Sequence, residues 1–344
     1  MDGVFETQPD RTDLPLVVMP VVIESMIGPF KQNFTMLDNV ARVRMYEDFT
    51  LDEDTIVERC KDADAVMVIG FHCADAILDR LDAKCYAFGG TGVASYINLE
   101  KTKERGIRVC NVLHYGDHAV AEHAMALAQA ANRRICKAYI KVRNNNFALD
   151  GLLGQNFYGA CAGIVGTGRI GAAMARICHG FGMNVLCYDM YKNPEVEKFA
   201  RYVSLEELLQ KADLVSLHCP LTEGTHHMIN KDTIAMMRDS AILVNTSRGG
   251  LIDTDALIEA LRARKFGGVG LDVYEDEDDQ VFQDFSDDVL ENEVVPVLLS
   301  FPNVVITSHQ AFFTRTALQS IAAITLENAR AFARGEELKN EVKA

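Results

Sequence analysis

The chain has 344 residues, of which 49% are hydrophobic, so it is long enough for about two domains with separate apolar cores. It carries 34 Lys and Arg against 49 Asp and Glu, and the formal net charge of -15 argues against nucleic acids and anionic membranes as partners. Nine cysteines without a Cys-x-x-Cys pair, an acidic N-terminus and the lack of any apolar run that could span a membrane predict a soluble, cytoplasmic protein with free thiols.

The first third of the chain alternates short apolar runs with helical patterns. Such alternation predicts a parallel sheet with helices on both faces, so we expect this part to form an α/β domain of its own. The helical patterns include residues 52–62 and 99–105. The apolar runs expected to be strands are residues 16–22, 43–46, 65–69, 85–88 and 107–112.

A glycine-rich turn directly follows one of these predicted strands. Backbone amides in such a turn can hold a carboxylate, so Gly90, Thr91 and Gly92 are candidate substrate-binding residues. A surface turn without a ligand explains the same pattern equally well.

A long helical pattern covers residues 119–134, with Asp117 placed to cap its N-terminus. His118, Glu122 and His123 stand near its start, and we interpret them as capping and packing residues. Glu122 and His123 lack the spacing of two metal ligands on one helix face. The sequence therefore predicts no metal site.

The next segment, residues 162–177, carries the motif around which the chain is organised. A short apolar strand leads to Gly166, Gly168 and Gly171 in the spacing Gly-x-Gly-x-x-Gly, and a helical pattern follows. In a dinucleotide-binding fold the first glycine makes a tight turn, and the second lets a pyrophosphate approach the backbone. The third lets the helix pack against the strand. The free amides and the dipole at the helix N-terminus favour the phosphates.

Asp189 follows the next apolar run, residues 184–188, and predicts which dinucleotide binds. A carboxylate at this place accepts hydrogen bonds from both hydroxyls of an adenosine ribose and repels a 2′-phosphate, so the predicted cofactor is NAD rather than NADP. A glycine-rich turn without a ligand is the alternative, which the order of strand, glycines, helix, strand and acid disfavours.

Six predicted strands joined by helices and led by this phosphate loop are typical of a Rossmann domain. A last helical pattern, residues 316–334, begins after the final strand, so we expect it to return to the first domain. The predicted fold class is α/β, with two doubly wound parallel-sheet domains, Rossmann-like and flavodoxin-like, and a cleft between them. The expected boundaries are 1–116 plus 314–344 for a discontinuous substrate domain and 117–313 for the NAD-binding domain. The six strands are residues 163–165, 184–188, 214–217, 242–245, 268–271 and 304–307.

Polar residues follow three of these strands, and ligands bind beyond the carboxyl ends of strands in an open parallel sheet. Arg248, Asp272 and His309 would therefore meet on one rim beside the cofactor. Arg248 can bind a carboxylate and a carbonyl oxygen through a forked hydrogen bond, and Asp272 would lie near the nicotinamide carboxamide. A protonated His309 can donate to the carbonyl oxygen as hydride arrives at carbon, and a nearby carboxylate would orient its ring and favour its protonated form.

Each of these residues also has a structural interpretation. Arg248 could pair with a surface acid, although a position between a strand end and two glycines is unusual for such a pair. His309 could equally be a buried structural imidazole. Glu277 lies in the acidic run 275–279, where solvated charge is the ordinary expectation.

From about residue 119 to residue 318 the chain resembles the D-isomer-specific 2-hydroxyacid dehydrogenases, and most of all the fermentative D-lactate dehydrogenases among them. Five motifs carry this resemblance, and together they are highly specific. They are Val-Gly-Thr-Gly-Arg-Ile-Gly at 165–171, Leu-His-Cys-Pro-Leu-Thr at 217–222, Val-Asn-Thr-Ser-Arg-Gly at 244–249, Gly-Leu-Asp-Val-Tyr-Glu at 270–275 and Ser-His-Gln-Ala-Phe at 308–312.

The resemblance implies that Arg248, Glu277 and His309 are catalytic. The family's glutamate lies five residues after the aspartate of the Asp-Val-Tyr motif, which selects Glu277 over Glu275. The family also implies a homo-oligomer, usually a dimer through the nucleotide domain, and closure of the two domains over the substrate. The implied contacts are Phe312 and Tyr115 for the substrate, and Arg169, Ile170, Asp189, Cys219, Pro220, Thr225, Thr246 and Asp272 for the cofactor.

The first domain departs from the family's pattern. Family members usually carry Gly-x-Gly followed by Asp-Asn and a second Asp, whereas residues 90–98 contain no acid. Residues 114–118 lack the proline that the D-lactate subgroup usually has, and His114 could take over part of the role of Tyr115. Because these loops hold the carboxylate and the side chain of the substrate, the departures bear on the substrate and leave the reaction class intact.

We therefore expect NADH-dependent reduction of a short 2-oxo acid to the D-2-hydroxy acid, with pyruvate to D-lactate as the first choice. The nearest alternative is the same chemistry on a bulkier 2-oxo acid, glyoxylate or hydroxypyruvate. The alternative from another class is an NAD(H)-sensing corepressor, because the family fold also serves such proteins. We expect no nucleic-acid or membrane partner, and a homo-oligomer that is a dimer or a tetramer.

Overall fold

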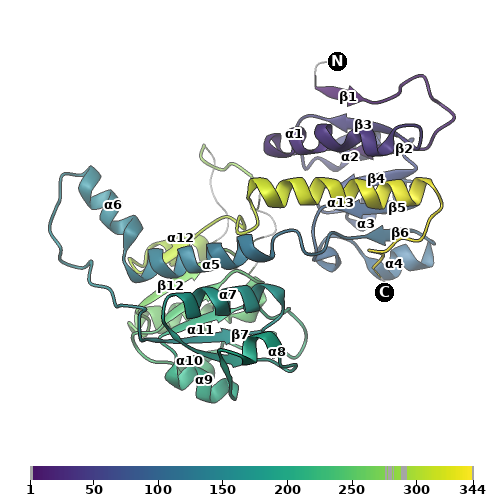
Figure 1. Ribbon diagram of the computed structural model, residues 1–344. Coiled ribbons are helices and arrows are strands. Elements are labelled where there is room, and N and C mark those ends of the chain that lie inside the picture. Colours follow the sequence, from purple (N-terminus) through teal and green to yellow (C-terminus); the bar gives the residue numbers. More distant parts are fainter. Residues whose placement is uncertain (1–2, 276, 278–280, 282, 288–292, 343–344) are drawn as a thin grey trace. The chain divides into compact units, whose positions relative to one another are not determined.

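The computed structural model describes residues 3–275, 277, 281, 283–287 and 293–342. It divides into two units, one of Met1–Tyr115 with Thr314–Ala344 and one of Gly116–Phe313 (Figure 1). Residues 276, 278 and 279 of the acidic run lie outside the described residues. No helix in these described ranges is long and apolar enough to span a membrane.

The first unit is built on a six-stranded sheet in the order β1-β3-β2-β4-β5-β6. Its strands pair in parallel except β1, an unexpected three-residue edge strand that runs antiparallel to β3. Without β1, the order is that of a flavodoxin-like doubly wound sheet. The strands are β1 (Val4–Glu6), β2 (Leu16–Met19), β3 (Arg42–Tyr46), β4 (Ala65–Val68), β5 (Cys85–Phe88) and β6 (Arg108–Cys110).

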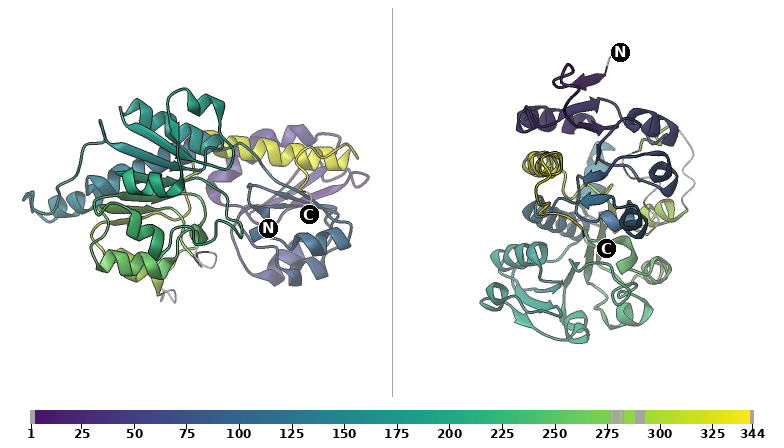
Figure 2. Two further views of the ribbon diagram at one scale, coloured as in Figure 1. Left: turned by 90° about the horizontal axis from the view of Figure 1, so that it is seen from below. Right: turned by 90° about the vertical axis from the view of Figure 1, so that its right-hand side faces the viewer.

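Helices cover both faces of this sheet. On one face α1 (Glu24–Asn33) and α13 (Arg315–Ala333) lie side by side, and α13 packs on β5 (Figure 2). On the other face an apolar core joins the sheet to α2 (Glu53–Cys60) and α3 (Asp75–Arg80), with α4 (Leu99–Glu104) beside β6. Two short 3-10 turns, η1 (Phe34–Leu37) and η2 (Val93–Ser95), complete the unit.

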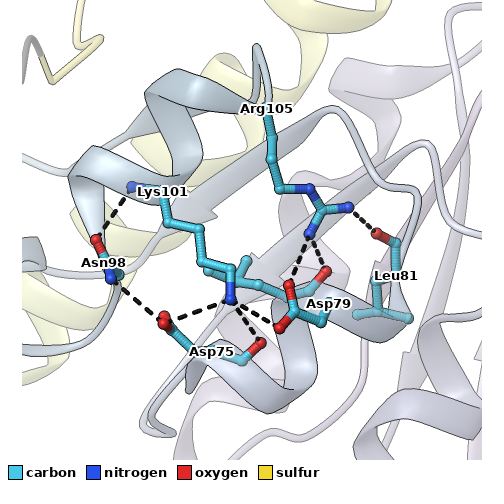
Figure 3. Close-up of polar contacts among 7 residues, drawn as sticks. Asp75, Asp79, Leu81, Asn98, Lys101 and Arg105 are labelled. Carbon is cyan, nitrogen blue, oxygen red and sulfur yellow. Dashed lines mark hydrogen bonds and ion pairs between the residues drawn. The ribbon is translucent and has the colours of Figure 1, made fainter.

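The glycine-rich segment after β5 leads through η2 into α4, and polar contacts tie α4 to α3 (Figure 3). The ammonium group of Lys101 lies 3.4 Å from the Asp75 carboxylate and 2.8 Å from the Asp79 carboxylate. Asn98 caps α4 by accepting a hydrogen bond from the Lys101 amide at 3.1 Å. These contacts fix the far end of the segment that begins at the candidate substrate loop.

The second unit has seven parallel strands in the order β13-β12-β11-β10-β7-β8-β9. This is the Rossmann order with one strand added at an edge, so the predicted class of two doubly wound α/β domains is confirmed. The two-residue β9 was not expected from the sequence. The strands are β7 (Cys161–Val165), β8 (Asn184–Tyr188), β9 (Arg201–Tyr202), β10 (Leu214–Leu217), β11 (Ile242–Asn245), β12 (Gly268–Leu271) and β13 (Val304–Ile306).

Two apolar cores attach helices to the two faces of the second sheet. One face carries α5 (Asp117–Asn132) and α7 (Arg169–Gly180), which pack on each other. The opposite face carries α9 (Leu205–Lys211), α10 (Lys231–Met236), α11 (Thr254–Arg262) and α12 (Val294–Leu299). Short turns are α8 (Pro194–Glu197) and η3 (Gly249–Leu251).

The predicted cap of α5 is wrong. Gly116 occupies the N-cap position, and no side chain caps the helix there. Asp117 is instead the first helical residue, and its carboxylate forms an ion pair with Arg169 at the start of α7. A charged partner on a neighbouring helix thus takes the carboxylate that the sequence pattern had assigned to the helix end.

The helix α6 (Ile135–Arg143) follows α5 and contains no buried residue. A left-handed φ of 52° at Arg134 separates the two helices. Tyr139 is 61% exposed and Ile140 58% exposed, and Phe147 in the following loop is 73% exposed. Figure 1 shows α6 extending away from the rest of its own unit. Exposed apolar side chains on such an arm are typical of a surface that another protein covers.

Candidate active site

The glycine loop joins β7 to α7, and its three glycines have different surroundings. At Gly166, where φ is +88°, an added Cβ would lie 2.6 Å from the Cys219 amide nitrogen. At Gly171 it would lie 1.9 Å from the carbonyl oxygen of Gly166. Around Gly168 nothing lies within 4 Å of such an atom. The fold itself therefore requires two of the glycines, and the third leaves open space at the N-terminus of α7, where phosphates bind well.

Asp189 follows β8, and the glycine loop orients its carboxylate. One oxygen accepts hydrogen bonds from the amide and, at 3.0 Å, from the hydroxyl of Thr167. The other oxygen accepts from the amide of Tyr191 at 3.0 Å. The hydroxyl of Tyr202 donates in turn to the Thr167 hydroxyl at 2.8 Å. Asp189 is thus held beside the phosphate loop, the place where a Rossmann domain binds the adenosine ribose.

Four further predicted cofactor residues follow β10 and β11, namely Cys219, Pro220, Thr225 and Thr246. Burial raises the pKa of the Cys219 thiol to about 11, so this side chain stays neutral. The Thr225 hydroxyl donates to the carbonyl oxygen of Pro220 at 2.7 Å and fixes the turn between them. Thr246 is buried, and its hydroxyl has no hydrogen-bond partner within the described part of the chain. Because an unpaired buried hydroxyl is costly, Thr246 fits a position that a polar cofactor group completes.

Three neighbouring strands bring together the residues that were expected on one rim. In the parallel ladder Asn245 pairs with Leu271, and Leu271 pairs with Ile306. Arg248, Asp272 and His309 follow these strands, so they all leave the sheet at its carboxyl edge. The three residues are far apart in the sequence, and the pairing of their strands brings them to the same edge of the sheet.

His309 and Glu277 form an ion pair, with 2.9 Å between Nδ1 and Oε1. Glu277 is 8% exposed, so the interpretation of this residue as solvated loop charge is wrong. The Tyr274 amide also donates to Glu277, at 3.3 Å. The backbone of His309 has a left-handed φ of 52°, and its amide donates to the carbonyl oxygen of Asp272 at 2.9 Å. The ring and the backbone of His309 are therefore both held in place.

Arg248 stands on a loop that packs against the loop of Glu277. An added Cβ at Gly249 would lie 2.1 Å from the backbone of Tyr274, so only glycine fits next to Arg248. The Asn245 side chain donates to the Arg248 carbonyl oxygen at 2.8 Å and fixes the backbone. The guanidinium donates to the Ser247 carbonyl oxygen at 2.7 Å and makes no ion pair within the residues that the structure describes. This arrangement suits a side chain that binds an anionic ligand.

Asp272 is 1% exposed, and its carboxylate holds the loop that carries His309. It accepts hydrogen bonds from the Thr307 hydroxyl and from the amides of Gln310, at 3.0 Å, and Ala311, at 2.8 Å. Burial alone would raise the pKa of Asp272, but hydrogen bonds from His123, Thr307 and these amides outweigh it and lower the pKa below its usual value of 3.8. The carboxylate therefore remains ionised.

His123 is a residue whose place in the site the sequence did not reveal. Its Nε2 lies 3.1 Å from the Thr307 hydroxyl and 3.4 Å from an Asp272 oxygen. Sequence reasoning assigned His123 to capping and packing, whereas the structure places it behind the Asp272 carboxylate. No spacing in the chain signals this contact, because it depends on α5 packing across β12.

The predicted substrate residues belong to different units. Phe312 lies in the second unit, where a Cβ on Gly116 would be 3.6 Å from the Phe312 Cβ. Gly90, Thr91, Gly92 and Tyr115 belong to the first unit. Two hydrogen bonds to Val112 fix the loop of Gly90–Gly92. The Thr91 hydroxyl donates to the Val112 carbonyl oxygen at 2.8 Å, and the Gly90 carbonyl oxygen accepts from the Val112 amide at 3.0 Å.

Comparisons with known proteins all point to one enzyme family. The model for the D-isomer specific 2-hydroxyacid dehydrogenase, NAD binding domain, matches residues 125–311. The 2-hydroxyacid dehydrogenase A of Aspergillus oryzae is 43% identical over 307 residues, which are 86% of each chain. The D-lactate dehydrogenase of Escherichia coli is 45% identical over 247 residues, 72% of this chain and 75% of that one. A solved structure, the pyruvate reductase of Chlamydomonas reinhardtii, superposes with a TM-score of 0.86 at 35% identity, covering 95% of this chain and 98% of that chain.

Proposed function

Because this chain belongs to the D-isomer-specific 2-hydroxyacid dehydrogenase family and is an NAD-dependent oxidoreductase, we propose that it reduces a short 2-oxo acid to the D-2-hydroxy acid, with pyruvate as the preferred substrate. The observation that carries the proposal is the pair of His309 and Glu277 at the sheet edge that also holds Arg248. The names of two relatives, a D-lactate dehydrogenase and a pyruvate reductase, support pyruvate over other 2-oxo acids.

The residues around the glycine loop fit NAD. The open space at Gly168 and the amides that begin α7 would hold the pyrophosphate, and Asp189 would accept hydrogen bonds from the ribose hydroxyls. Thr246 would satisfy its buried hydroxyl on the cofactor. Bound NADH supplies the hydride for the carbonyl carbon. The further residues proposed to contact it are Arg169, Ile170, Cys219, Pro220, Thr225 and Asp272.

Arg248 and His309 would do the chemistry on the substrate. The planar guanidinium of Arg248 would bind the carboxylate and the carbonyl oxygen of the 2-oxo acid. Because Nδ1 of His309 is turned to Glu277, Nε2 is the atom that donates a proton to that oxygen. The negative charge of Glu277 stabilises the protonated ring and orients it. In the reverse direction the neutral ring removes the proton from the hydroxyl group.

We also assign substrate binding to the turn of Gly90, Thr91 and Gly92, which belongs to the first unit. The amides of Gly90, Thr91 and Gly92 donate no hydrogen bond to any group in the described ranges, so they are suited to an anion. A Cβ atom added at Gly90 would have no other atom within 4 Å, so the space beside this residue is open. We assign Tyr115 and Phe312 to the substrate as well, and these roles stay predictions.

The arm formed by α6 supports a homo-oligomer. Its apolar side chains are exposed on the single chain, and a second copy of the chain would cover them. Light scattering coupled to gel filtration distinguishes a dimer from a tetramer. A monomer at micromolar concentration would contradict the assignment. A cytoplasmic location stays a prediction.

The experiment that tests the proposed function follows the loss of NADH with pyruvate, 2-oxobutyrate, phenylpyruvate, 2-oxoisocaproate, glyoxylate and hydroxypyruvate, with chiral analysis of each product. We expect the fastest turnover with pyruvate and a D-product. A preference for another acid would keep the mechanism and assign the unusual loop of residues 90–98 to substrate specificity. NADH binding without turnover on any acid would contradict the proposal and favour an NAD(H)-sensing protein.

A further inference from the structure

His226, His227 and Glu275 form a cluster outside the residues assigned to catalysis. Nε2 of His227 lies 2.6 Å from Oε1 of Glu275. The rings of His226 and His227 are stacked, with their centroids 3.9 Å apart. One nitrogen or oxygen atom from each of the three side chains lies within 4.8 Å of the others. Sequence reasoning considered only the neighbours Glu122 and His123 as metal ligands and found no site.

We propose that these three side chains bind a divalent transition-metal ion of the zinc class. Two imidazole nitrogens and one carboxylate oxygen are a donor set that zinc uses in proteins, with water as the fourth ligand. Zinc ligands at about 2.0–2.1 Å from the metal in tetrahedral geometry lie about 3.3 Å from one another. His227 and Glu275 would therefore separate by less than about 1 Å to admit the ion.

The surroundings of Glu275 prepare it for a cation. Its second oxygen accepts hydrogen bonds from the amide of Thr254 at 3.0 Å and from the Thr254 hydroxyl at 2.6 Å. These hydrogen bonds fix the orientation of the carboxylate, as is common for ligating carboxylates.

The two histidines have different surroundings. The backbone of His227 is fixed, because its amide donates to Gly250 at 2.8 Å and its carbonyl oxygen accepts from Asn230 at 2.9 Å. The side chain of His226 is exposed, so its ring can turn toward an ion at little cost. Imidazole nitrogens also select the class of metal, because they favour zinc, nickel or copper over magnesium and calcium.

The test is a calorimetric titration of the full chain with zinc chloride. Cys136 is exposed and its thiol would itself bind zinc, so the titrations use the Cys136→Ser background. We expect one zinc ion per chain at micromolar concentration, and no binding of magnesium chloride at the same concentration. His226→Ala should weaken zinc binding at least about tenfold, a loss of about 1.4 kcal/mol.

A matched control is His179→Ala, which removes an exposed histidine of α7 that packs against Phe199, outside the proposed metal ligands. This change should leave the zinc affinity unaltered. Glu275→Gln provides an independent second variant, because it keeps an oxygen for Thr254 and removes the charge. Equal zinc affinity in all the variants, or no saturable binding by the Cys136→Ser protein, would overturn the proposal. The titration needs no 2-oxo acid, so its failure is distinct from failure of the proposed reaction.

Discussion

Nδ1 of His309 lies 2.9 Å from Oε1 of Glu277, and the two residues follow adjacent strands of the sheet. Glu275, on the same loop as Glu277, faces His227 instead at 2.6 Å. The loop thus gives its two carboxylates separate partners. Only the pair with Glu277 includes a residue of the loop after β13, namely His309, whose amide binds the Asp272 carbonyl oxygen. This difference separates the proposed acid–base pair from the proposed metal ligands.

Replacing His309 by Ala should abolish most turnover and leave NADH binding intact. Positioned acid–base groups contribute on the order of a hundred- to ten-thousand-fold, so kcat should fall by that range. Glu277→Gln should lower kcat less, because the amide still orients the ring and only the charge is lost. Stopped-flow hydride transfer and NADH fluorescence titrations measure the two effects separately. A near-normal kcat for His309→Ala would refute the acid assignment.

Arg248→Lys should raise the KM for the 2-oxo acid. Lysine keeps the positive charge and loses the fork that binds two oxygens, and charge-assisted hydrogen bonds are worth about 1.5–3 kcal/mol. The expected increase in KM is therefore about tenfold to a hundredfold. The dissociation constant for NADH should stay unchanged and serves as the internal control. Unchanged KM and kcat would count against Arg248 as the residue that binds the substrate.

Much of this site was predictable because parallel strands end at one edge of their sheet. The pattern of strand, glycines and helix located the phosphate loop, and Arg248, Asp272 and His309 each follow a strong apolar run. The choice of Glu277 over Glu275 came only from the family resemblance. Nothing in the local sequence distinguishes the two carboxylates, because burial of Glu277 results from tertiary packing.

Other features depend on contacts that have no local signal. The strands β1 and β9 are two or three residues long and gain their structure by pairing with a longer neighbour. His123 reaches Asp272 only because α5 packs across the sheet. Asp117 has the sequence of a helix cap, and Arg169 takes its carboxylate instead. In each case a partner distant along the chain overrides a local preference.

Two alanine substitutions in the glycine loop should separate folding from cofactor binding. Gly171→Ala places a Cβ 1.9 Å from the Gly166 carbonyl oxygen, so we expect the free energy of unfolding to fall by at least about 2 kcal/mol. Gly168→Ala meets no atom within 4 Å, so the Tm without cofactor should stay the same. Its methyl group would still obstruct the pyrophosphate, and NADH binding should weaken at least about tenfold. Normal NADH affinity in Gly168→Ala would contradict the assignment of this loop.

His218 should make the second unit less stable in mild acid. Burial lowers the pKa of His218 from 6.5 to about 4, and its Nε2 lies 2.8 Å from the Ser216 hydroxyl. Near neutral pH the ring is uncharged in the folded and the unfolded chain, so it has no effect on stability there. As the pH falls below 6.5, only the unfolded chain takes up the proton, and the folded state loses stability progressively until the pH reaches about 4. Between pH of about 7.5 and about 5, the proton taken up by the unfolded chain at this one residue should cost about 1–2 kcal/mol of stability. Urea unfolding at both values should show a smaller loss for His218→Gln than for the unaltered chain, and equal losses would show that burial does not hold the ring neutral.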